Sequence, residues 1–287
     1  MGIWDFIVAI IYGIVEGITE WIPVSSTGHM ILLDEFLKMN VSDAFFELYL
    51  VVIQLGAVLA ALVLFWQDIW PFGKKNNNKP FRDKGWGSYI KADRFSMWFK
   101  ICVACIPGVA TEFLISDYSD AHFYNFVCVA IALIVFGILF VFVEKVFCRK
   151  RNFRVNDIDE ISYKDAIIIG LWQMIAAIFP GTSRSGATIV GSLLIGIKRE
   201  TAAKFTFIMA VPVMFGASIL KILRYDGGCS NNELLLLALS MIVAFAVSFV
   251  VIRKLMAYIR KRSYVVFGWY RILLGIVVLT YYFVKYR

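Results

Sequence analysis

The sequence has few charged side chains for its length. Only 17% of its 287 residues are charged, whereas 60% are hydrophobic and the mean hydropathy is +0.75. A soluble domain contains about 25% charged and about 45–50% apolar residues. This excess of apolar side chains is too large for one globular core, so the composition predicts a protein surrounded by lipid.

Other scarce residue types exclude several kinds of site. His29 and His122 are the only histidines, which excludes a multi-histidine metal cluster. The five cysteines are an odd number and indicate no disulfide framework. No Lys or Arg precedes Lys38, so the start lacks the basic region of a secretory signal. We therefore expect its apolar segment to remain in the mature protein.

The basic residues lie in short clusters between apolar runs, and this distribution argues against nucleic-acid binding despite the net charge of +8. The clusters are Lys74–Lys100, Lys145–Arg154 and Arg253–Arg262. The positive-inside rule places all three in the cytoplasm. The intervening loops, 117–122 and 224–233, are short and acidic or neutral, as external loops are. The charge pattern therefore predicts a multi-pass membrane protein.

Six apolar runs have about the 20 residues that a membrane-spanning helix needs. They are Phe45–Trp66, Trp98–Ser116, Phe123–Val143, Ala202–Leu223, Leu234–Ile252 and Tyr264–Val284. Two further apolar regions, Gly2–Leu37 and Tyr163–Ile197, are interrupted by Pro, Gly, Ser and Thr at 23–28 and 180–186. Each half is too short to span comfortably, so we expect two re-entrant helical hairpins beside six transmembrane helices. The predicted fold is an all-α polytopic membrane protein.

The two interrupted regions resemble each other. The separation of Gly13 and Pro23 equals that of Gly170 and Pro180. At that offset the aligned pairs are Glu16 with Gln173, Ser26 with Ser183, and Thr27 with Arg184, and Gly-Ala pairs follow at Gly56-Ala57 and Gly216-Ala217. The first unit ends in the predicted cytoplasm and the second begins there. Residues 1–70 and 160–225 are thus predicted cores of an inverted-topology repeat within one membrane domain, 1–287.

Charged residues at membrane depth are costly and by default mark a functional site. Glu16 and Glu20 lie four residues apart, on one face of a helix. Two such carboxylates repel unless a cation, a shared proton or an arginine lies between them. The alternative is a helix end near the interface with solvated glutamates. Arg271, inside the last run, could pair with the site or snorkel to the cytoplasmic face, and snorkelling is the preferred prediction. Gln54 could hydrogen-bond either the site or another helix.

The first interruption has the composition of an anion site. Ser25, Ser26 and Thr27 supply three hydroxyl donors, and the turn through Gly28 exposes backbone N–H groups at a helix start. His29 follows at once. These residues predict a phosphate-binding turn with an acid/base group beside it.

The second interruption has the same build with an arginine at its centre. Arg184 lies between Ser183 and Ser185, and Gly186 follows. An arginine at the midplane needs an anionic partner, and guanidinium matches phosphate in a bidentate fork. Loops that only let helices pack closely would explain the Gly and Ser residues but not Arg184 and His29. If the two turns meet, we expect one phosphate pocket.

Two long motifs carry a resemblance to a known family. Residues 16–29 read EGITEWIPVSSTGH and residues 180–188 read PGTSRSGAT. They resemble the signature motifs of the integral-membrane undecaprenyl-pyrophosphate phosphatases of the bacitracin-resistance type. The resemblance covers nearly the whole chain, including Val52–Gly56 and Ala210–Pro212. It implies six spanning helices with two re-entrant hairpins, a bacterial inner (cytoplasmic) membrane, a site facing the periplasm or exterior, and a divalent cation.

The resemblance also implies roles for individual residues. Glu16 and Glu20 would be the acidic pair, which we expect to hold Mg²⁺ or Ca²⁺ or to tune His29. Ser26 and His29 would sit at the reacting phosphate and Arg184 would clamp it. The predicted substrate-binding residues are Ser25, Thr27, Gly28, Ser183, Ser185, Gly186 and Gln54. Ser26 with His29 as general acid/base is the preferred reading; direct attack by His29 or by an activated water are the alternatives.

The predicted reaction is hydrolysis of undecaprenyl (polyprenyl) diphosphate to the monophosphate and inorganic phosphate, which recycles the lipid carrier for cell-wall glycan synthesis. A lipid flippase or secondary transporter is the main alternative, because inverted repeats with broken helices are typical of transporters. A purely structural scaffold is the third. The predicted partners are the lipid substrate and membrane lipid, without nucleic acid. Small residues such as Gly137 and Ala244 would allow close helix packing within a protomer or in a homodimer.

Overall fold

The computed structural model describes residues 2–73, 77, 79–148 and 152–285. Parts of two predicted basic clusters, residues 74–76, 78 and 149–151, lie outside the described residues. The helices are α1 (Ile3–Thr19), α2 (Ser26–Phe36), α3 (Asp43–Val52), α4 (Gln54–Leu64), α5 (Trp66–Ile69), α6 (Ala92–Leu114), α7 (Ser116–Phe123), α8 (Phe126–Phe142), α9 (Tyr163–Ile178), α10 (Arg184–Leu194), α11 (Arg199–Leu223), α12 (Asn231–Ile259) and α13 (Val265–Lys285). Short 3-10 or π turns occur at 85–89, 143–147 and 158–160. The described chain is thus all-α apart from isolated β-bridges.

Six segments of the described chain are long and apolar enough to cross a membrane. They are Asp43–Leu64, Ala92–Leu114, Phe126–Phe147, Arg199–Leu223, Asn231–Ile259 and Val265–Lys285. They coincide with the six predicted runs, which confirms the all-α polytopic fold. The first of them is α3 and α4 in series, broken at Ile53. The run length and hydropathy do not predict this break, because the residues around Ile53 are mostly apolar.

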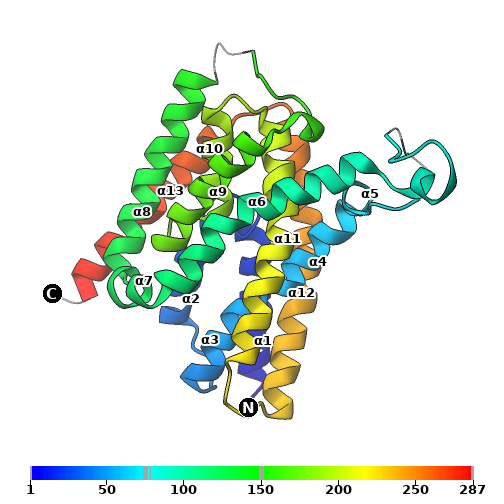
Figure 1. Ribbon diagram of the computed structural model, residues 1–287. Helices are drawn as coiled ribbons and strands as arrows, with labels where there is room; N and C mark the ends of the chain where they lie inside the picture. Colours follow the sequence, from blue (N-terminus) through cyan, green and yellow to red (C-terminus); the bar gives the residue numbers. More distant parts are fainter. Residues whose placement is uncertain (1, 74–76, 78, 149–151, 286–287) are drawn as a thin grey trace.

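The interrupted regions form the helix pairs α1–α2 and α9–α10. In Figure 1, α1 and α2 occupy the lower half of the bundle, and α9 and α10 the upper half. α1 packs against α12, and α9 packs against α6. The first helix of each pair therefore lies along a spanning helix from elsewhere in the chain. Their re-entrant placement in a membrane and their inverted topology remain predictions.

Glycines let both first helices approach their partners at backbone distance. A Cβ on Gly13 would lie 2.7 Å from the carbonyl oxygen of Ser240, and a Cβ on Gly170 would lie 2.4 Å from that of Ala104. Real Cβ atoms almost never come so close, so neither position has room for a side chain. The later Gly-Ala pairs differ. A Cβ on Gly56 would lie 2.2 Å from the Met241 carbonyl oxygen, whereas one on Gly216 would meet nothing within 4 Å.

The start of α9 is fixed outside the spanning segments by a buried carboxylate. Asp165 accepts hydrogen bonds from the Ser162 N–H (3.0 Å) and hydroxyl (2.7 Å), and from Arg154 at 2.5 Å. Burial alone would raise the pKa of Asp165, but the bonds from Arg154 and Ser162 outweigh it, and its pKa falls below the usual value. This anchor sets where α9 enters the bundle, and hence where the second turn lies.

Candidate active site

The two turns share an unusual backbone. Ser25 (φ 73°) and Ser183 (φ 68°) are the only non-glycine residues with positive φ in the part of the chain that the structure describes. Each caps the following helix: the Gly28 N–H donates to the Ser25 hydroxyl (3.3 Å), and the Gly186 N–H donates to the Ser183 hydroxyl (3.1 Å). A non-glycine residue in this region of φ is strained, and such strain clusters at functional sites.

This shared geometry corrects one predicted alignment. The caps pair Ser25 with Ser183, so Ser26, and not Thr27, is the counterpart of Arg184 as the first residue of its helix. The cause is one extra residue between the proline and the capping serine in the second turn, which contains Gly181 at φ 92°. Counting at a fixed offset from the prolines cannot reveal such an insertion.

The turns meet at Glu20. Arg184 forms a salt bridge with its Oε1 atom, while the Ser26 hydroxyl donates to its Oε2 atom at 2.7 Å. The Ser185 hydroxyl donates to the Glu20 backbone carbonyl at 3.2 Å, and lies 3.2 Å from the Ser183 hydroxyl. Glu20 is 8% exposed. One carboxylate therefore joins the predicted nucleophile on the first hairpin to the predicted phosphate clamp on the second.

Glu16 lies next to Glu20 and has a carboxylate oxygen that is not hydrogen-bonded. Its side chain is 1% exposed, it interacts with Glu20, and its Oε1 atom has no hydrogen-bond partner. A buried carboxylate oxygen without a partner is costly, so this atom is suited to bind a cation or to carry a proton. Its predicted counterpart, Gln173, is also buried with an unpartnered Oε1 atom, but its amide lies against Gly108 of α6.

His29 is held at both ring nitrogens. Its Nδ1 atom lies 2.7 Å from the Ser25 carbonyl oxygen, and its Nε2 atom lies 2.7 Å from the Tyr270 hydroxyl on α13. Both ring nitrogens thus have partners other than Ser26, whose hydroxyl donates to Glu20 instead. The predicted pairing of Ser26 with His29 is not formed here, and Tyr270 is a site residue that the sequence reading missed.

The structure decides between the two alternatives for Arg271. Its side chain is fully buried, so it does not snorkel. One of its nitrogens donates to the Pro23 carbonyl (3.2 Å), and another donates to the carbonyls of Gly181 (2.9 Å) and Thr182 (2.7 Å). Arg271 thus ties the two turns together through backbone oxygens. Snorkelling fails because these inward-facing carbonyls offer the guanidinium a closer set of acceptors.

The remaining predicted residues lie around this centre. Gly28 is buried, and a Cβ there would come within 3.3 Å of Leu133. Thr27 is half-buried on the first turn of α2. Gln54 donates to the Leu50 carbonyl at 3.4 Å, so its bond stays within its own broken span at the α3–α4 junction.

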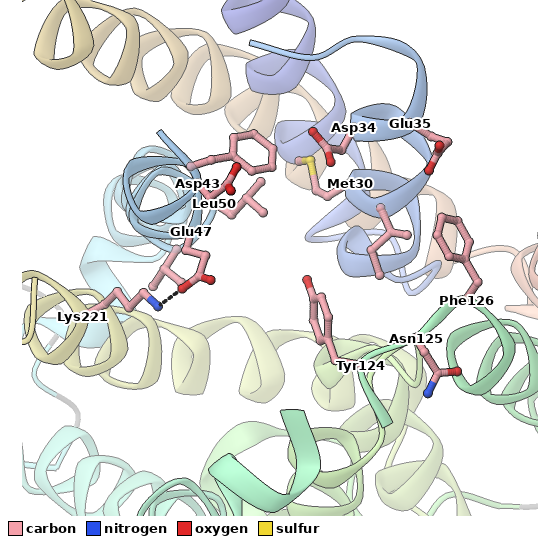
Figure 2. Close-up of a pocket in the computed structure, with 13 residues that line it drawn as sticks. Met30, Asp34, Glu35, Asp43, Glu47, Leu50, Tyr124, Asn125, Phe126 and Lys221 are labelled. Atoms are coloured by element: carbon pink, nitrogen blue, oxygen red, sulfur yellow. Dashed lines mark hydrogen bonds and ion pairs between the residues drawn. The ribbon is translucent and has the colours of Figure 1, made fainter. Parts of the chain in front are cut away.

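A cavity of about 660 Å³ lies beyond α2, between α3, the start of α8 and the end of α11. Figure 2 shows Tyr124 pointing into this space. It also shows the ion pair between Lys221 of α11 and Glu47 of α3 (3.0 Å). Its lining residues are Met30, Ile31, Asp34, Glu35, Asp43, Phe46, Glu47, Leu50, Val51, Tyr124, Asn125, Phe126 and Lys221. Burial raises the pKa of Asp34. The cavity touches α2 next to His29 but does not contain Glu20, Ser26 or Arg184.

The carboxylates of the junction suit a hard cation only in part. No group of three or more His, Cys, Asp or Glu side chains with metal-binding geometry occurs among the described residues. Glu20 uses both oxygens on Arg184 and Ser26, so the unpartnered Oε1 atom of Glu16 is the free protein donor. Mg²⁺ is commonly held by one or two carboxylates, water and substrate phosphate. The residues present fit a cation that the substrate helps to bind.

Comparison with known proteins shows the family of this chain. A family described as bacitracin resistance protein BacA matches residues 9–277. An undecaprenyl-diphosphatase of Desulfitobacterium hafniense is 51% identical over 282 residues, 98% of each chain. One of Enterococcus faecalis is 51% identical over 275 residues, 96% of each chain, and undecaprenyl-diphosphatase 1 of Clostridium acetobutylicum is 48% identical over 280 residues, 98% of each chain. The chain therefore belongs to the bacitracin resistance protein BacA family.

Proposed function

We propose that this protein is an undecaprenyl-diphosphatase, which hydrolyses undecaprenyl diphosphate to the monophosphate and inorganic phosphate and so recycles a carrier lipid for cell-wall synthesis. The observation that carries the proposal is the Glu20 junction, where a hydroxyl and a guanidinium from two different hairpins meet on one carboxylate. The relatives' names give the substrate, and this junction supplies groups suited to phosphoryl transfer.

Arg184 and the N-terminal ends of α2 and α10 are the proposed substrate-binding groups. The first N–H groups of α2 and α10 lack partners within their helices, and helix N-termini attract anions. Arg184 can offer further N–H donors beside its bond to Glu20. Ser183 and Ser185 add hydroxyls next to it. Together these donors can neutralise the terminal phosphate, and such positioned charge is the main contribution in phosphoryl transfer.

Ser26 is the proposed nucleophile. Its hydroxyl attacks the terminal phosphorus, its proton passes to Glu20, and the bond to the bridging oxygen breaks, which releases undecaprenyl monophosphate. Water then cleaves the phosphoserine and releases inorganic phosphate. The proposal is supported by the 2.7 Å bond from Ser26 to Glu20. His29, close by on the same helix, is the proposed proton donor or acceptor for the second step.

Glu16 is the proposed holder of a divalent cation, Mg²⁺ or Ca²⁺, beside Glu20, whose two oxygens already contact Arg184 and Ser26. A bound cation would neutralise charge on the diphosphate. Support comes from the unpartnered, buried Oε1 atom of Glu16. Among the residues that the structure describes, Arg184 is the one positive side chain that contacts either of these two carboxylates.

The protein is a multi-pass membrane protein, and we place it in the bacterial inner membrane with its site open to the exterior. The basic clusters support a cytoplasmic position for the loops after α5 and α12. α1 then begins on the outer side, and the 660 Å³ cavity beside α2 lies on that side too. A homodimer remains a prediction.

The test is phosphate release from undecaprenyl diphosphate by the detergent-purified protein, with and without Mg²⁺ or Ca²⁺. Metal-dependent release, lost in Arg184→Ala and His29→Ala, is the expected result. A folded protein that binds the lipid without releasing phosphate would contradict the proposal and favour the flippase alternative. Lipid flux across liposomes would then decide.

A further inference from the structure

Tyr270 lies at the point where α13 meets the first hairpin. It directly precedes Arg271, whose guanidinium bonds the backbone of both turns, so this part of α13 is held against the site. α13 also packs closely against α8. A Cβ on Gly268 would lie 2.8 Å from the Gly137 carbonyl oxygen, so the two backbones are in near contact there. The hydroxyl of Tyr270 is thus presented to His29 from a fixed support.

The contacts of His29 define its tautomer. A backbone carbonyl can only accept a hydrogen bond, so the 2.7 Å contact with the Ser25 oxygen requires a proton on Nδ1. In the neutral ring, Nε2 then carries the lone pair and accepts the Tyr270 O–H, also at 2.7 Å. The two rings are parallel within 2°, with centroids 5.6 Å apart. Such a second partner is what normally sets which imidazole nitrogen is protonated.

We propose that Tyr270 is a positioning residue for His29, which holds the imidazole as the Nδ1–H tautomer and leaves Nε2 as the basic nitrogen for proton transfer. The expected effect of Tyr270 on the reaction rate rests on the proposed function. The tautomer of His29 does not, because it follows from the hydrogen bonds alone. The Nε2 atom exchanges the Tyr270 hydroxyl for water or a phosphate oxygen during turnover. Without Tyr270, the ring is held at Nδ1 alone and can turn away about its χ2 bond.

The chain is well suited to a direct test, because His122 is its only other histidine. His122 bonds the Tyr118 carbonyl and stacks on the Tyr118 ring, far from the site in sequence. In a His122→Gln background, ¹⁵N-histidine labelling gives NMR signals from His29 alone. The spectra are recorded at alkaline pH, where the imidazole is neutral.

The expected parent spectrum shows a protonated Nδ1 atom and a hydrogen-bonded, unprotonated Nε2 atom. Tyr270→Phe should move the Nε2 resonance toward that of a free lone pair. It should also lower kcat about tenfold, with KM changed less than about twofold, as expected when a group acts on the reaction step and not on binding.

Tyr281→Phe is the matched control. It removes a hydroxyl from the same helix, where the ring packs against Phe36, and it should change neither spectrum nor kcat. A parent with Nε2 protonated would overturn the proposal, as would a Tyr270→Phe variant with an unchanged His29 spectrum or unchanged kcat. Because the spectrum is read without turnover, a failure of the tautomer is distinguishable from a failure of the proposed reaction.

Discussion

The two turns have nearly the same backbone and very different chemistry. Each has a positive-φ serine that caps the next helix through the N–H three residues on. The first hairpin then carries acid/base groups, Glu16, Glu20 and His29, whereas the second carries Arg184 and, in place of Glu16, the neutral Gln173. We propose that the two turns use the same frame for different roles, with proton transfer in the first and positive charge in the second.

The largest effect is expected at the single charge of the second turn. Arg184→Ala should lower kcat by about a thousandfold, the scale seen when a positioned donor to a developing oxyanion is removed. It also leaves Glu20 without its cationic partner. Phosphate release measures the loss. Arg260→Ala, which removes an exposed ion pair with Glu200 (2.7 Å), is the control and should keep near-normal turnover.

Exchanging the carboxylate and the amide tests the division of roles. Glu16→Gln makes the first hairpin resemble the second, and should lower kcat about tenfold to a hundredfold and raise the cation concentration needed for half-maximal activity. Gln173→Glu should leave the cation requirement unchanged, because its side chain lies against α6. Equal cation titrations for Glu16→Gln and the parent would refute the assigned role.

Gly13 of α1 and Gly170 of α9 test whether the two helices pack equally closely against their partner helices. Gly13→Ala and Gly170→Ala should each destabilise the protein by about 1–3 kcal/mol, because the added methyl group overlaps a backbone carbonyl. Thermal unfolding in detergent measures this. Gly216→Ala meets open space and should be neutral or slightly stabilising. A loss of stability in only one of these two variants would show that α1 and α9 do not pack equally closely.

The smallest effects are expected at the capping serines. Ser25→Gly and Ser183→Gly should each change stability by only a few tenths of a kcal/mol, because glycine relieves the positive φ while the cap is lost. The two Ser→Ala changes should cost about 1–2 kcal/mol, since alanine keeps the strain and removes the cap. Thermal unfolding again measures the change. Clearly unequal losses of stability in Ser25→Ala and Ser183→Ala would show that the two serines do not play equivalent structural roles.

Much of this arrangement could be predicted from the sequence. Spanning helices follow from run length and hydropathy, and Arg184 was singled out because a lone cation at membrane depth needs a partner. The predicted meeting of the two turns is borne out by the contacts of Glu20 with Ser26 and Arg184.

Other features depend on three-dimensional contacts that no pattern records. The sequence marks Arg271 as a charge inside an apolar helix, but only the fold shows that three carbonyls converge on it. Tyr270 looks like any interfacial aromatic residue. The one-residue shift between the turns arises at Gly181, where an extra residue is accommodated by a positive φ.

The most direct test of a site shared by two hairpins is a double-mutant cycle across the junction. The rate of phosphate release from undecaprenyl diphosphate is measured for Glu20→Gln, Arg184→Gln and the double variant, each checked for folding by thermal unfolding. We predict strong non-additivity, with the double variant little slower than the slower single variant, because groups that act as a unit fail together. Independent, multiplying effects, or near-normal turnover in either folded single variant, would contradict the account.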